Sequence, residues 1–352
     1  MTVAMADPKL DWGIAGCGWV ARDYVGPAIA ASANGRVAAL YDPDPASLHR
    51  AAGLFGEAVA HAELEAFLAT PGLGAVYVAA PNHAHRALVE AAARAGLPVL
   101  CEKPMATTLA DAQAMVAACR AAGVPYATAF DQRFHAAHRL LADMVAQGRL
   151  GTVIAVRIVY ACWLPADWAG DNWRIDPRRA GGGALMDLAP HGLDLASVIL
   201  GEPLVDVAAM GQTRVHHYAV EDGAALMARS ASGTLVQMHV AYNCPETLPR
   251  RRLEVVGTAG QVIARDTMGQ TPGGTLEWID AATGVTEMLE VPGVERSPFL
   301  NQVEAFADAV RSGRAFPFPP EHDLATMALV LRAQAMAAAV LIPAERSSDA
   351  AE

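Results

Sequence analysis

The chain has 352 residues, of which 53% are hydrophobic and 18% are charged, and its formal net charge is −11. This is the composition of a globular protein, and the length suffices for two domains around a large buried core. The densest basic run, Arg250–Arg252, stands at the start of an expected strand, where we interpret it as a solvated face or an interface pair. Composition and charge therefore argue against binding to nucleic acid or to an anionic membrane surface.

The sequence also predicts no membrane or secreted location. The longest alanine-rich helical run, Ala335–Ile342, is shorter than a membrane span. Residues 1–10 lack the charged and apolar regions of a signal peptide. The five cysteines form no Cys-x-x-Cys pair, so we expect reduced thiols rather than disulfides or zinc ligands. We expect a cytoplasmic protein.

The first third of the sequence alternates short strands with helices, which is typical of a parallel α/β sheet. The expected strands are Trp12–Ala15, Arg36–Tyr41, Ala75–Ala79, Pro98–Cys101 and Tyr126–Ala129. The expected helices are Val20–Ser32, Ala46–Leu54, Glu63–Leu68, Asn82–Ala95 and Leu109–Ala121. We therefore predict an α/β domain over residues 1–130.

The pattern changes after residue 130. One long alternating strand, Val153–Cys162, precedes a Trp-rich loop and an apolar helix. Between Val205 and Leu289, strand-like runs and glycine turns follow one another without helices, which favours an antiparallel sheet. We predict a second α/β domain over residues 131–352. Its other expected helices are Ala136–Gln147, Phe299–Val310 and Asp323–Val340.

A glycine loop, Gly16-x-Gly18-x-x-Ala21, stands where the first strand turns into a helix. Alone, such glycines can simply make a turn. In a dinucleotide site the first glycine allows the tight turn, the second lets the backbone approach the pyrophosphate, and the third position needs a small residue. The start of the helix, at Trp19 and Val20, then offers free amides to the phosphates.

Asp42 ends the next strand, 24 residues after Gly18. A carboxylate at this spacing binds the ribose hydroxyls of a dinucleotide and repels a 2′-phosphate. The neighbours Pro43 and Asp44 supply no arginine for such a phosphate. We therefore expect NAD as the cofactor rather than NADP.

Two further polar segments follow strands at the carboxyl edge of the sheet, where ligands bind in such folds. Pro81, Asn82 and His85 follow the third strand; Asn82 is a helix cap, a cofactor contact or both, and His85 suits a structural role better than a catalytic one. Glu102 and Lys103 follow the fourth strand; a surface ion pair in a loop is the alternative, but their place after a parallel strand, in a chain with a dinucleotide loop, favours a site. Because Pro104 comes next, Lys103 favours an extended backbone that projects its side chain from the strand end.

Asp187 and His191 are four residues apart on the apolar helix, so they share one face. A polar face in solvent is the alternative, but the surrounding leucines indicate a buried helix. The segment Gly181–Gly183 before it lets other groups approach closely. A histidine is the natural proton acceptor near neutral pH.

Three tryptophans (Trp163, Trp168 and Trp173) lie in the loop before this helix. Indole rings cover the apolar faces of sugars, although loop tryptophans also pack cores and subunit contacts. We expect the substrate pocket to include Trp163, Asn172, Trp173 and Arg174. The histidine pairs at 135/138 and 216/217 lack a completing acid or cysteine, so we expect no metal.

Over nearly its whole length the chain resembles the Gfo/Idh/MocA family, named for glucose–fructose oxidoreductase, inositol dehydrogenase and the MocA rhizopine protein. The resemblance rests on four segments: Gly16-Cys17-Gly18-Trp19-Val20-Ala21, Pro81-Asn82-His83-Ala84-His85, Glu102-Lys103-Pro104, and Gly181-Gly182-Gly183 with Asp187 and His191. It implies a Rossmann domain followed by an α/β domain with an open, mostly antiparallel sheet. It also implies a homo-oligomer, dimeric or tetrameric, built on that sheet.

The resemblance assigns the dehydrogenase reaction to Lys103, Asp187 and His191. One departure concerns Ala189-Pro190, where the family commonly has a glycine. A proline within a helix removes a hydrogen bond and can kink it. We therefore expect a geometry of Asp187 and His191 that differs from a straight pair, unless Pro190 lies in a first turn.

The expected reaction is hydride transfer between NAD and a secondary alcohol carbon of a sugar, cyclitol or sugar derivative. His191 is the expected base, Lys103 stabilises the reacting oxygen, and Asp187 orients the imidazole or binds a neighbouring hydroxyl. One alternative is NAD-assisted glycoside cleavage with a recycled cofactor. Another is a non-catalytic regulator that senses a sugar or dinucleotide, against which the complete proton-transfer set argues.

Overall fold

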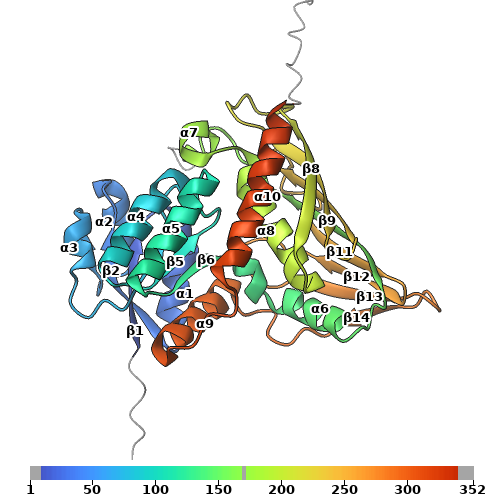
Figure 1. Ribbon diagram of the computed structural model, residues 1–352, viewed down its shortest axis with the longest axis horizontal. Helices are drawn as coiled ribbons and strands as arrows, with labels where there is room; N and C mark the ends of the chain where they lie inside the picture. The colour runs from blue at the N-terminus through green and yellow to red at the C-terminus, as the bar shows by residue number, and fades with distance from the viewer. Residues whose placement is uncertain (1–8, 169–171, 340–352) are drawn as a thin grey trace, which may run out of the picture.

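The computed structural model describes residues 9–168 and 172–339, which form two sheets with helices around and between them (Figure 1). The first sheet is parallel, with strand order β3-β2-β1-β4-β5-β6. Its strands are β1 (Leu10–Ala15), β2 (Gly35–Tyr41), β3 (Val59–His61), β4 (Ala75–Val78), β5 (Val99–Glu102) and β6 (Tyr126–Ala129). The predicted Rossmann-type sheet is confirmed, with β3 as a sixth strand that the sequence pattern did not indicate.

Helices cover both faces of this sheet because its central strands are apolar on both sides. Its local helices are η1 (Ala21–Val25), α1 (Gly26–Ala31), α2 (Pro45–Leu54), α3 (Leu64–Leu68), η2 (Asn82–Ala84), α4 (His85–Arg94) and α5 (Leu109–Ala122). The first predicted helix thus begins with a π-helical turn, and the predicted Asn82–Ala95 helix starts as a 3₁₀ turn.

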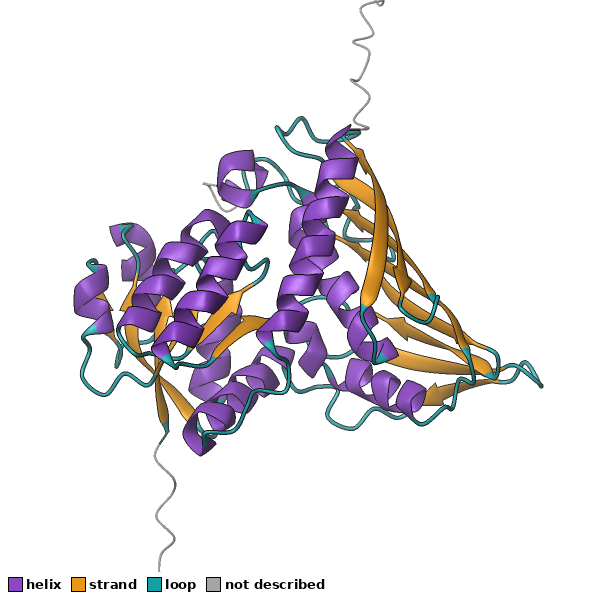
Figure 2. Ribbon diagram, viewed as in Figure 1, coloured by secondary structure: helices purple, strands orange, loops and turns teal. Residues whose placement is uncertain are grey.

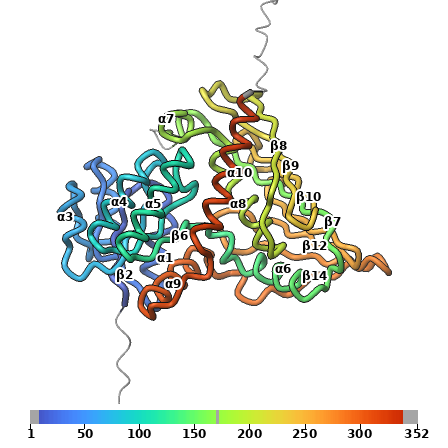
Figure 3. Tube along the Cα trace, in the orientation of Figure 1, coloured from blue at the N-terminus to red at the C-terminus, as the bar shows by residue number. Residues whose placement is uncertain are grey.

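The helix α9 (Pro298–Ser312) comes from the far end of the chain and also packs on the first sheet, beside α1 (Figure 3). Phe306 is fully buried, with its ring centroid 5.6 Å from that of Trp12 on β1. Val303 and Phe299 join the same cluster. Residues 131–352 therefore do not all pack within the second domain, and the predicted division at residue 130 stays a prediction.

The second sheet has the strand order β14-β13-β12-β11-β7-β10-β9-β8, and only β7 and β10 are parallel. Its strands are β7 (Val153–Ala161), β8 (Leu204–Gln212), β9 (Gly223–Ser230), β10 (Leu235–Ala241), β11 (Arg251–Gly257), β12 (Gly260–Arg265), β13 (Thr275–Asp280) and β14 (Thr286–Leu289). The expectation of a mostly antiparallel sheet is confirmed.

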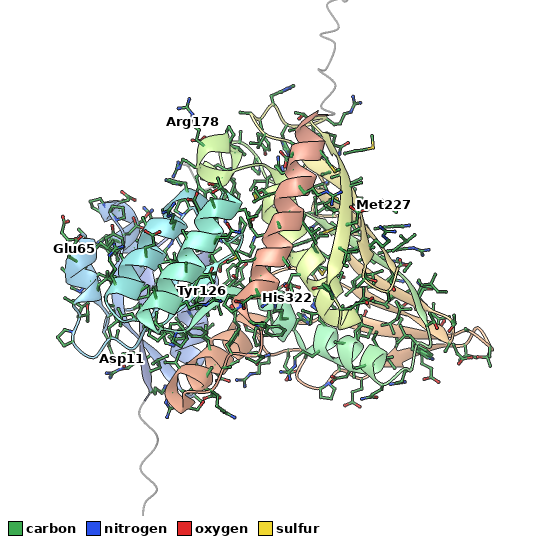
Figure 4. All side chains as sticks on the ribbon, viewed as in Figure 1. Asp11, Glu65, Tyr126, Arg178, Met227 and His322 are labelled. Carbon is green, nitrogen blue, oxygen red and sulfur yellow. The ribbon has the colours of Figure 1, made fainter. Side chains whose placement is uncertain are left out.

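Helices cover this sheet only on the side that faces the first domain (Figure 2). The helices α8 (Ala184–Leu200) and α10 (Pro320–Ala339) pack on its strands. The other helices of this part of the chain are η3 (Asp131–Phe134), α6 (Ala136–Ala146), η4 (Trp173–Ile175) and α7 (Pro177–Ala180). The strands alternate accordingly: on β9, Met227 extends from the open side, whereas Leu226 and Ala228 are buried (Figure 4).

The segment Pro177–Leu200 is long and apolar enough to cross a membrane by length and composition, which the sequence analysis did not anticipate. In the structure, 83% of its apolar window is buried inside the protein. Its main part, α8, lies between the second sheet and the helices α6 and α10. The core helix of a globular protein passes the same test.

A fully buried arginine, Arg133 of η3, connects elements of both domains. It donates from Nε to Asp194 on α8 at 2.8 Å, and a second nitrogen reaches Asp323 on α10. The other Asp323 oxygen accepts the backbone amide of Thr128 on β6. The guanidinium also lies over the Phe130 ring, 4.5 Å from its centroid. This network fixes η3, α8 and α10 against the last strand of the first sheet.

Replacing this cation should strongly destabilise the protein. Arg133→Ala removes the guanidinium that Asp194 and Asp323 share, so we expect a loss of about 3–5 kcal/mol in the free energy of unfolding. Urea titration followed by tryptophan fluorescence measures it. As a control, Arg157→Ala removes an exposed arginine paired with Glu254 and should cost at most about 1 kcal/mol. Equal losses in the two variants would contradict a central role for Arg133.

Candidate active site

A cavity of about 260 Å³ opens between the carboxyl edge of the first sheet and helix α8 of the second domain. The first sheet contributes Glu102 and Lys103 from the end of β5 and Asp131 from the segment after β6. Asp187 and His191 on α8 face them. The cavity therefore brings together all three residues predicted to be catalytic.

Lys103 and Asp187 form an ion pair across this cavity. Lys103 Nζ donates to Asp187 Oδ1 at 2.7 Å and to the Asp187 backbone oxygen at 2.9 Å. The hydroxyl of Tyr242 donates to the other carboxylate oxygen at 2.8 Å. Burial alone would raise the pKa of Asp187, but Lys103 and Arg174 hold it well below its usual range. Asp187 is therefore a fixed anion that positions the lysine.

The carboxylate closest to His191 is Asp131, not Asp187. Asp131 Oδ1 lies 3.4 Å from His191 Nδ1, and both side chains are almost fully buried. Neither ring nitrogen of His191 has a hydrogen-bond partner among the described residues. Gln132 Nε2 donates to the second Asp131 oxygen at 2.8 Å and to the Gly269 backbone oxygen at 2.7 Å. The structure thus places Asp131, rather than Asp187, where it can orient the imidazole.

Burial gives Asp131 and His191 unusual proton affinities. Burial, with the negative charge of Glu102 nearby, raises the pKa of Asp131 to about 7. Burial and the positive charge of Lys103 lower the pKa of His191 well below its ordinary value. Near neutral pH the imidazole is therefore uncharged, and the group that titrates is the Asp131 carboxyl.

The start of α8 is set by a glycine and a buried acid. A side chain at Gly183 would collide with the Glu221 backbone oxygen, 2.0 Å from the Cβ position. Glu221 Oε1 accepts the amides of Gly183 and Leu185, which satisfies donors at the helix start. Pro190 lies well inside α8, which nevertheless continues to Leu200, so Asp187 and His191 still line one cavity.

The glycine loop has the shape that a dinucleotide phosphate requires. Gly16 has a φ of 97°, and a Cβ there would lie 2.5 Å from the Ala80 amide nitrogen, so only glycine fits. A side chain at Gly18 would instead enter open space, which leaves the backbone approachable. Trp19 and Val20 line the cavity.

Asp42 lies at the end of β2 beside this loop. Its two oxygens accept the backbone amides of Cys17 at 2.7 Å and Asp44 at 2.8 Å. These bonds hold the carboxylate in place, and each oxygen keeps a lone pair for a further donor. Loop and carboxylate together fit the phosphate and ribose of a dinucleotide.

In the segment after β4, one predicted residue lines the cavity and two do not. Asn82 lines the cavity and, instead of capping its helix, donates to the Ala180 backbone oxygen at 2.8 Å. His85 is fully buried outside the cavity lining, with ring nitrogens near the backbone oxygens of Ala80, Pro104 and Met105. His85 and Pro81 do not line the cavity, and His85 instead fastens the Lys103–Pro104 turn.

Tryptophans surround Arg174 at one side of the cavity. Its guanidinium carbon lies 4.6 Å from the Trp173 ring and 5.1 Å from that of Trp168, and Trp168 contacts Trp19 of the first domain edge-on. Trp163 also lines the cavity. Asn172 is not part of this lining: it is buried and donates to the Pro165 backbone oxygen at 3.3 Å, and its predicted place in the substrate pocket stays a prediction.

Asp131 and Tyr242 are residues of this site that the sequence patterns did not single out. Asp131 follows β6 at the same sheet edge as Asp42 and Glu102, so the edge rule that singled out those residues also applied to it. Tyr242 follows β10, a strand of the second sheet. Its contact with Asp187 spans 55 positions of the sequence, and no local pattern signals it.

Comparison with known proteins agrees with this geometry. Residues 10–130 match the model of the oxidoreductase family with an NAD-binding Rossmann fold, and residues 138–263 match that of the Gfo/Idh/MocA C-terminal domain. The chain belongs to the Gfo/Idh/MocA family of oxidoreductases, as the sequence motifs predicted.

Similar proteins with assigned activities include the 1,5-anhydro-D-fructose reductase of Ensifer adhaerens, which is 37% identical over 75% of this chain and 78% of its own length. The D-xylose 1-dehydrogenase (NADP⁺) 2 of Haloferax volcanii is 32% identical over 90% of this chain and 94% of its own length. Among solved structures, the aldose–aldose oxidoreductase of Caulobacter crescentus, crystallised with glycerol, superposes with a TM-score of 0.84 at 27% identity, covering 94% of this chain and 98% of the other.

The titration of Asp131 should control the pH dependence of alcohol oxidation. When its carboxyl is protonated it donates to Nδ1 of His191, which leaves the proton on Nε2 and no free base. When the carboxyl ionises, near pH 7, Nδ1–H donates to it and Nε2 becomes free to accept a proton. We therefore expect kcat/KM for oxidation to rise with pH through about 7.

Asp131→Asn tests this assignment. The amide donates to Nδ1 at every pH, so we expect turnover to fall by at least about 100-fold and the inflection near pH 7 to disappear. The raised pKa of Asp131 costs folding stability above the pKa of the unfolded chain, so the variant should also melt higher than wild type at pH 8. Asp143→Asn, an exposed acid on α6, is the matched control. An unchanged inflection in Asp131→Asn would assign it to another group.

Proposed function

We propose that this oxidoreductase transfers hydride between NAD and a secondary alcohol carbon of a sugar, cyclitol or sugar derivative. The observation that carries the proposal is the convergence of Lys103 and His191 in one cavity beside the glycine loop. The sugar-processing relatives support the substrate class. The nicotinamide supplies the hydride chemistry when bound, and the protein handles the proton and orients the alcohol.

In the oxidation direction, His191 Nε2 accepts the hydroxyl proton. Burial keeps the imidazole neutral, and Asp131 Oδ1 lies 3.4 Å from Nδ1, where the ionised carboxylate can accept the Nδ1 hydrogen and keep Nε2 free. Burial raises the pKa of Asp131 to about 7, so the carboxylate that can accept this hydrogen forms near neutral pH. In the reduction direction the same nitrogen returns the proton to the oxygen.

Lys103 stabilises the negative charge that develops on the reacting oxygen. An ammonium has three donors, and Asp187 accounts for two of them, through its carboxylate and its backbone oxygen. The third can reach the substrate oxygen. Tyr242 and Arg174 hold Asp187 from its other side, so the lysine is fixed before substrate arrives.

The cofactor we propose is NAD rather than NADP. Asp42 supports this choice, because a fixed carboxylate binds ribose hydroxyls and repels a 2′-phosphate. The amides after Gly16 and Gly18 would hold the pyrophosphate. The name of one relative includes NADP⁺, so the proposal rests on residues of this chain and not on the cofactors of its relatives.

Two alternatives use the same fold. A glycoside-cleaving enzyme with a recycled cofactor would yield product without net NADH, and a sensor would bind sugar without turnover. The Lys103–Asp187 pair and the Asp131–His191 pair favour an enzyme, because a sensor gains nothing from placing a neutral base beside a fixed ammonium.

We also propose that the protein is a homo-oligomer, dimer or tetramer, of the cytoplasm, with no membrane or nucleic-acid partner. The open face of the second sheet exposes Met210, Met227 and Leu235, each by 45% or more, and a second copy could cover them. All five cysteines are free thiols, which suits a reducing compartment. Light scattering of the purified protein tests the assembly, and a monomeric mass would reject it.

The direct test is NADH formation, followed by absorbance, with a panel of aldoses, cyclitols, sugar acids and anhydrosugars. We expect turnover on one class, and losses of roughly 100-fold or more in Lys103→Ala and His191→Ala with NADH binding retained. Chromatography of the products reveals cleavage without net NADH. Full activity in both variants would reject the mechanism.

Cofactor choice is tested at position 42. Asp42→Ala removes a charged acceptor, so we expect kcat/KM with NAD to fall roughly 10- to 100-fold while that with NADP rises or stays unchanged. The ratio of the two values is the measurement. Asp44→Ala, which removes the neighbouring acid that caps α2, controls for general loss of charge and should leave the ratio near that of wild type. A wild-type preference for NADP would contradict the assignment.

A further inference from the structure

The basic run Arg250–Arg252 separates into three different environments. Arg252 faces the open side of the sheet and pairs with Glu254. Arg250 lies 3.6 Å from Glu246 in the preceding loop. Arg251, between them, lines the active-site cavity, as Arg250 does, but has no acid beside it among the described residues. The sequence reading as a solvated face or interface pair therefore fails for Arg251.

Arg251 occupies a position where the sheet otherwise carries apolar residues. It has the same side-chain direction on β11 as Leu253 and Val255, both fully buried. Its guanidinium lies over Gly269, where a Cβ would be 2.6 Å from one terminal nitrogen. A glycine at position 269 thus leaves room for the cation.

Arg251 is linked to the proposed catalytic base, His191, through Tyr160. It pairs directly with Tyr160 on the adjacent strand β7. The Tyr160 ring contacts the His191 ring edge-on, with centroids 5.6 Å apart. Because adjacent strands are separated by about 5 Å, the guanidinium and the imidazole can contact one sugar-sized molecule.

No group of the described residues neutralises Arg251. Its Nε is buried without a hydrogen-bond partner, and its guanidinium forms no ion pair within residues 9–168 and 172–339. The other cations that line the cavity are each paired with a carboxylate: Lys103 and Arg174 form ion pairs with Asp187, and Arg250 forms one with Glu246. A half-buried cation without a counter-ion is costly, and a ligand anion would offset that cost.

The acids of the wall do not supply this anion. Glu102 accepts from the Tyr77 hydroxyl, and burial raises its pKa. Asp131 is engaged by Gln132 and faces His191. The cavity therefore keeps an unneutralised cation although the whole chain carries a formal net charge of −11.

We propose that the substrate is an acidic sugar whose carboxylate binds Arg251 while one of its hydroxyls meets His191 and Lys103. The inference rests on the proposed function and names its substrate class. A planar guanidinium binds a carboxylate through two parallel hydrogen bonds, which fixes both orientation and charge. The cofactor pyrophosphate is the other available anion, but the glycine loop and helix start already offer it amides, and Arg251 belongs to the opposite domain.

The test uses neutral sugars matched with acids of the same carbon chain: D-glucose with D-glucuronate and D-gluconate, and D-galactose with D-galacturonate and D-galactonate. We expect wild type to favour at least one acid over its neutral counterpart in kcat/KM. Arg251→Gln should lower kcat/KM for that acid roughly 10- to 100-fold and change the neutral sugar less than about 3-fold. Arg251→Lys keeps the positive charge but cannot form two parallel hydrogen bonds, so its kcat/KM for the acid should lie between those of wild type and Arg251→Gln. Arg252→Gln, on the open face, should match wild type.

Binding supplies a readout that does not need turnover. Titration calorimetry of the NADH-loaded protein with the same sugars gives their dissociation constants. Tighter binding of an acid that is lost in Arg251→Gln, without any oxidation, would support the inference while rejecting the dehydrogenase. Oxidation of a neutral sugar, with no acid bound or turned over more effectively than its counterpart, would reject the inference alone. A loss of NADH affinity in Arg251→Gln equal to the loss for the acid would assign the anion to the cofactor and overturn the proposal.

Discussion

The buried guanidinium of Arg133 is the constraint on which the site geometry depends. It lies two residues after Asp131, and its partner Asp194 lies three residues after His191. One ion pair therefore fixes the spacing between the carboxylate and the imidazole, although they come from different elements. The link to Asp323 extends the constraint to α10 and, through the Thr128 amide, to the first sheet. A shift of Arg133, Asp194 or Asp323 would therefore also displace Asp131 or His191.

The two buried carboxylates near the reaction centre behave differently because their neighbours differ. Asp187 faces two cations and the Tyr242 hydroxyl, so it stays ionised and holds Lys103. Asp131 is more deeply buried and lies near Glu102, so its pKa is raised to about 7 and it titrates near neutral pH. One is a permanent charge that positions a cation, and the other is a titrating group that decides which imidazole nitrogen is free. Burial alone would have made them alike.

Local patterns were enough to predict both sheets, the glycine loop and the Lys103, Asp187 and His191 set, because these depend on periodicity and on strand ends. The short strand β3 lacks a run of β-branched residues and was missed. Asn172 bonds the Pro165 backbone oxygen instead of lining the cavity, and a loop sequence does not say which side chains turn inward. Tyr242 and the return of α9 to the first sheet depend on contacts between distant parts of the sequence. The inward position of Arg251 was readable from the alternation with Leu253 and Val255.

The return of α9 also affects how the protein is made. When residue 130 leaves the ribosome, all six strands of the first sheet exist, but the face around Trp12 still lacks Phe306 and its neighbours. The missing helix is complete roughly 180 residues later, which at typical synthesis rates is a delay on the order of 10 to 40 s. During that interval an apolar surface of the nascent domain is open to chaperones or to aggregation. The cofactor-binding domain is thus finished only after most of the second domain has been synthesised.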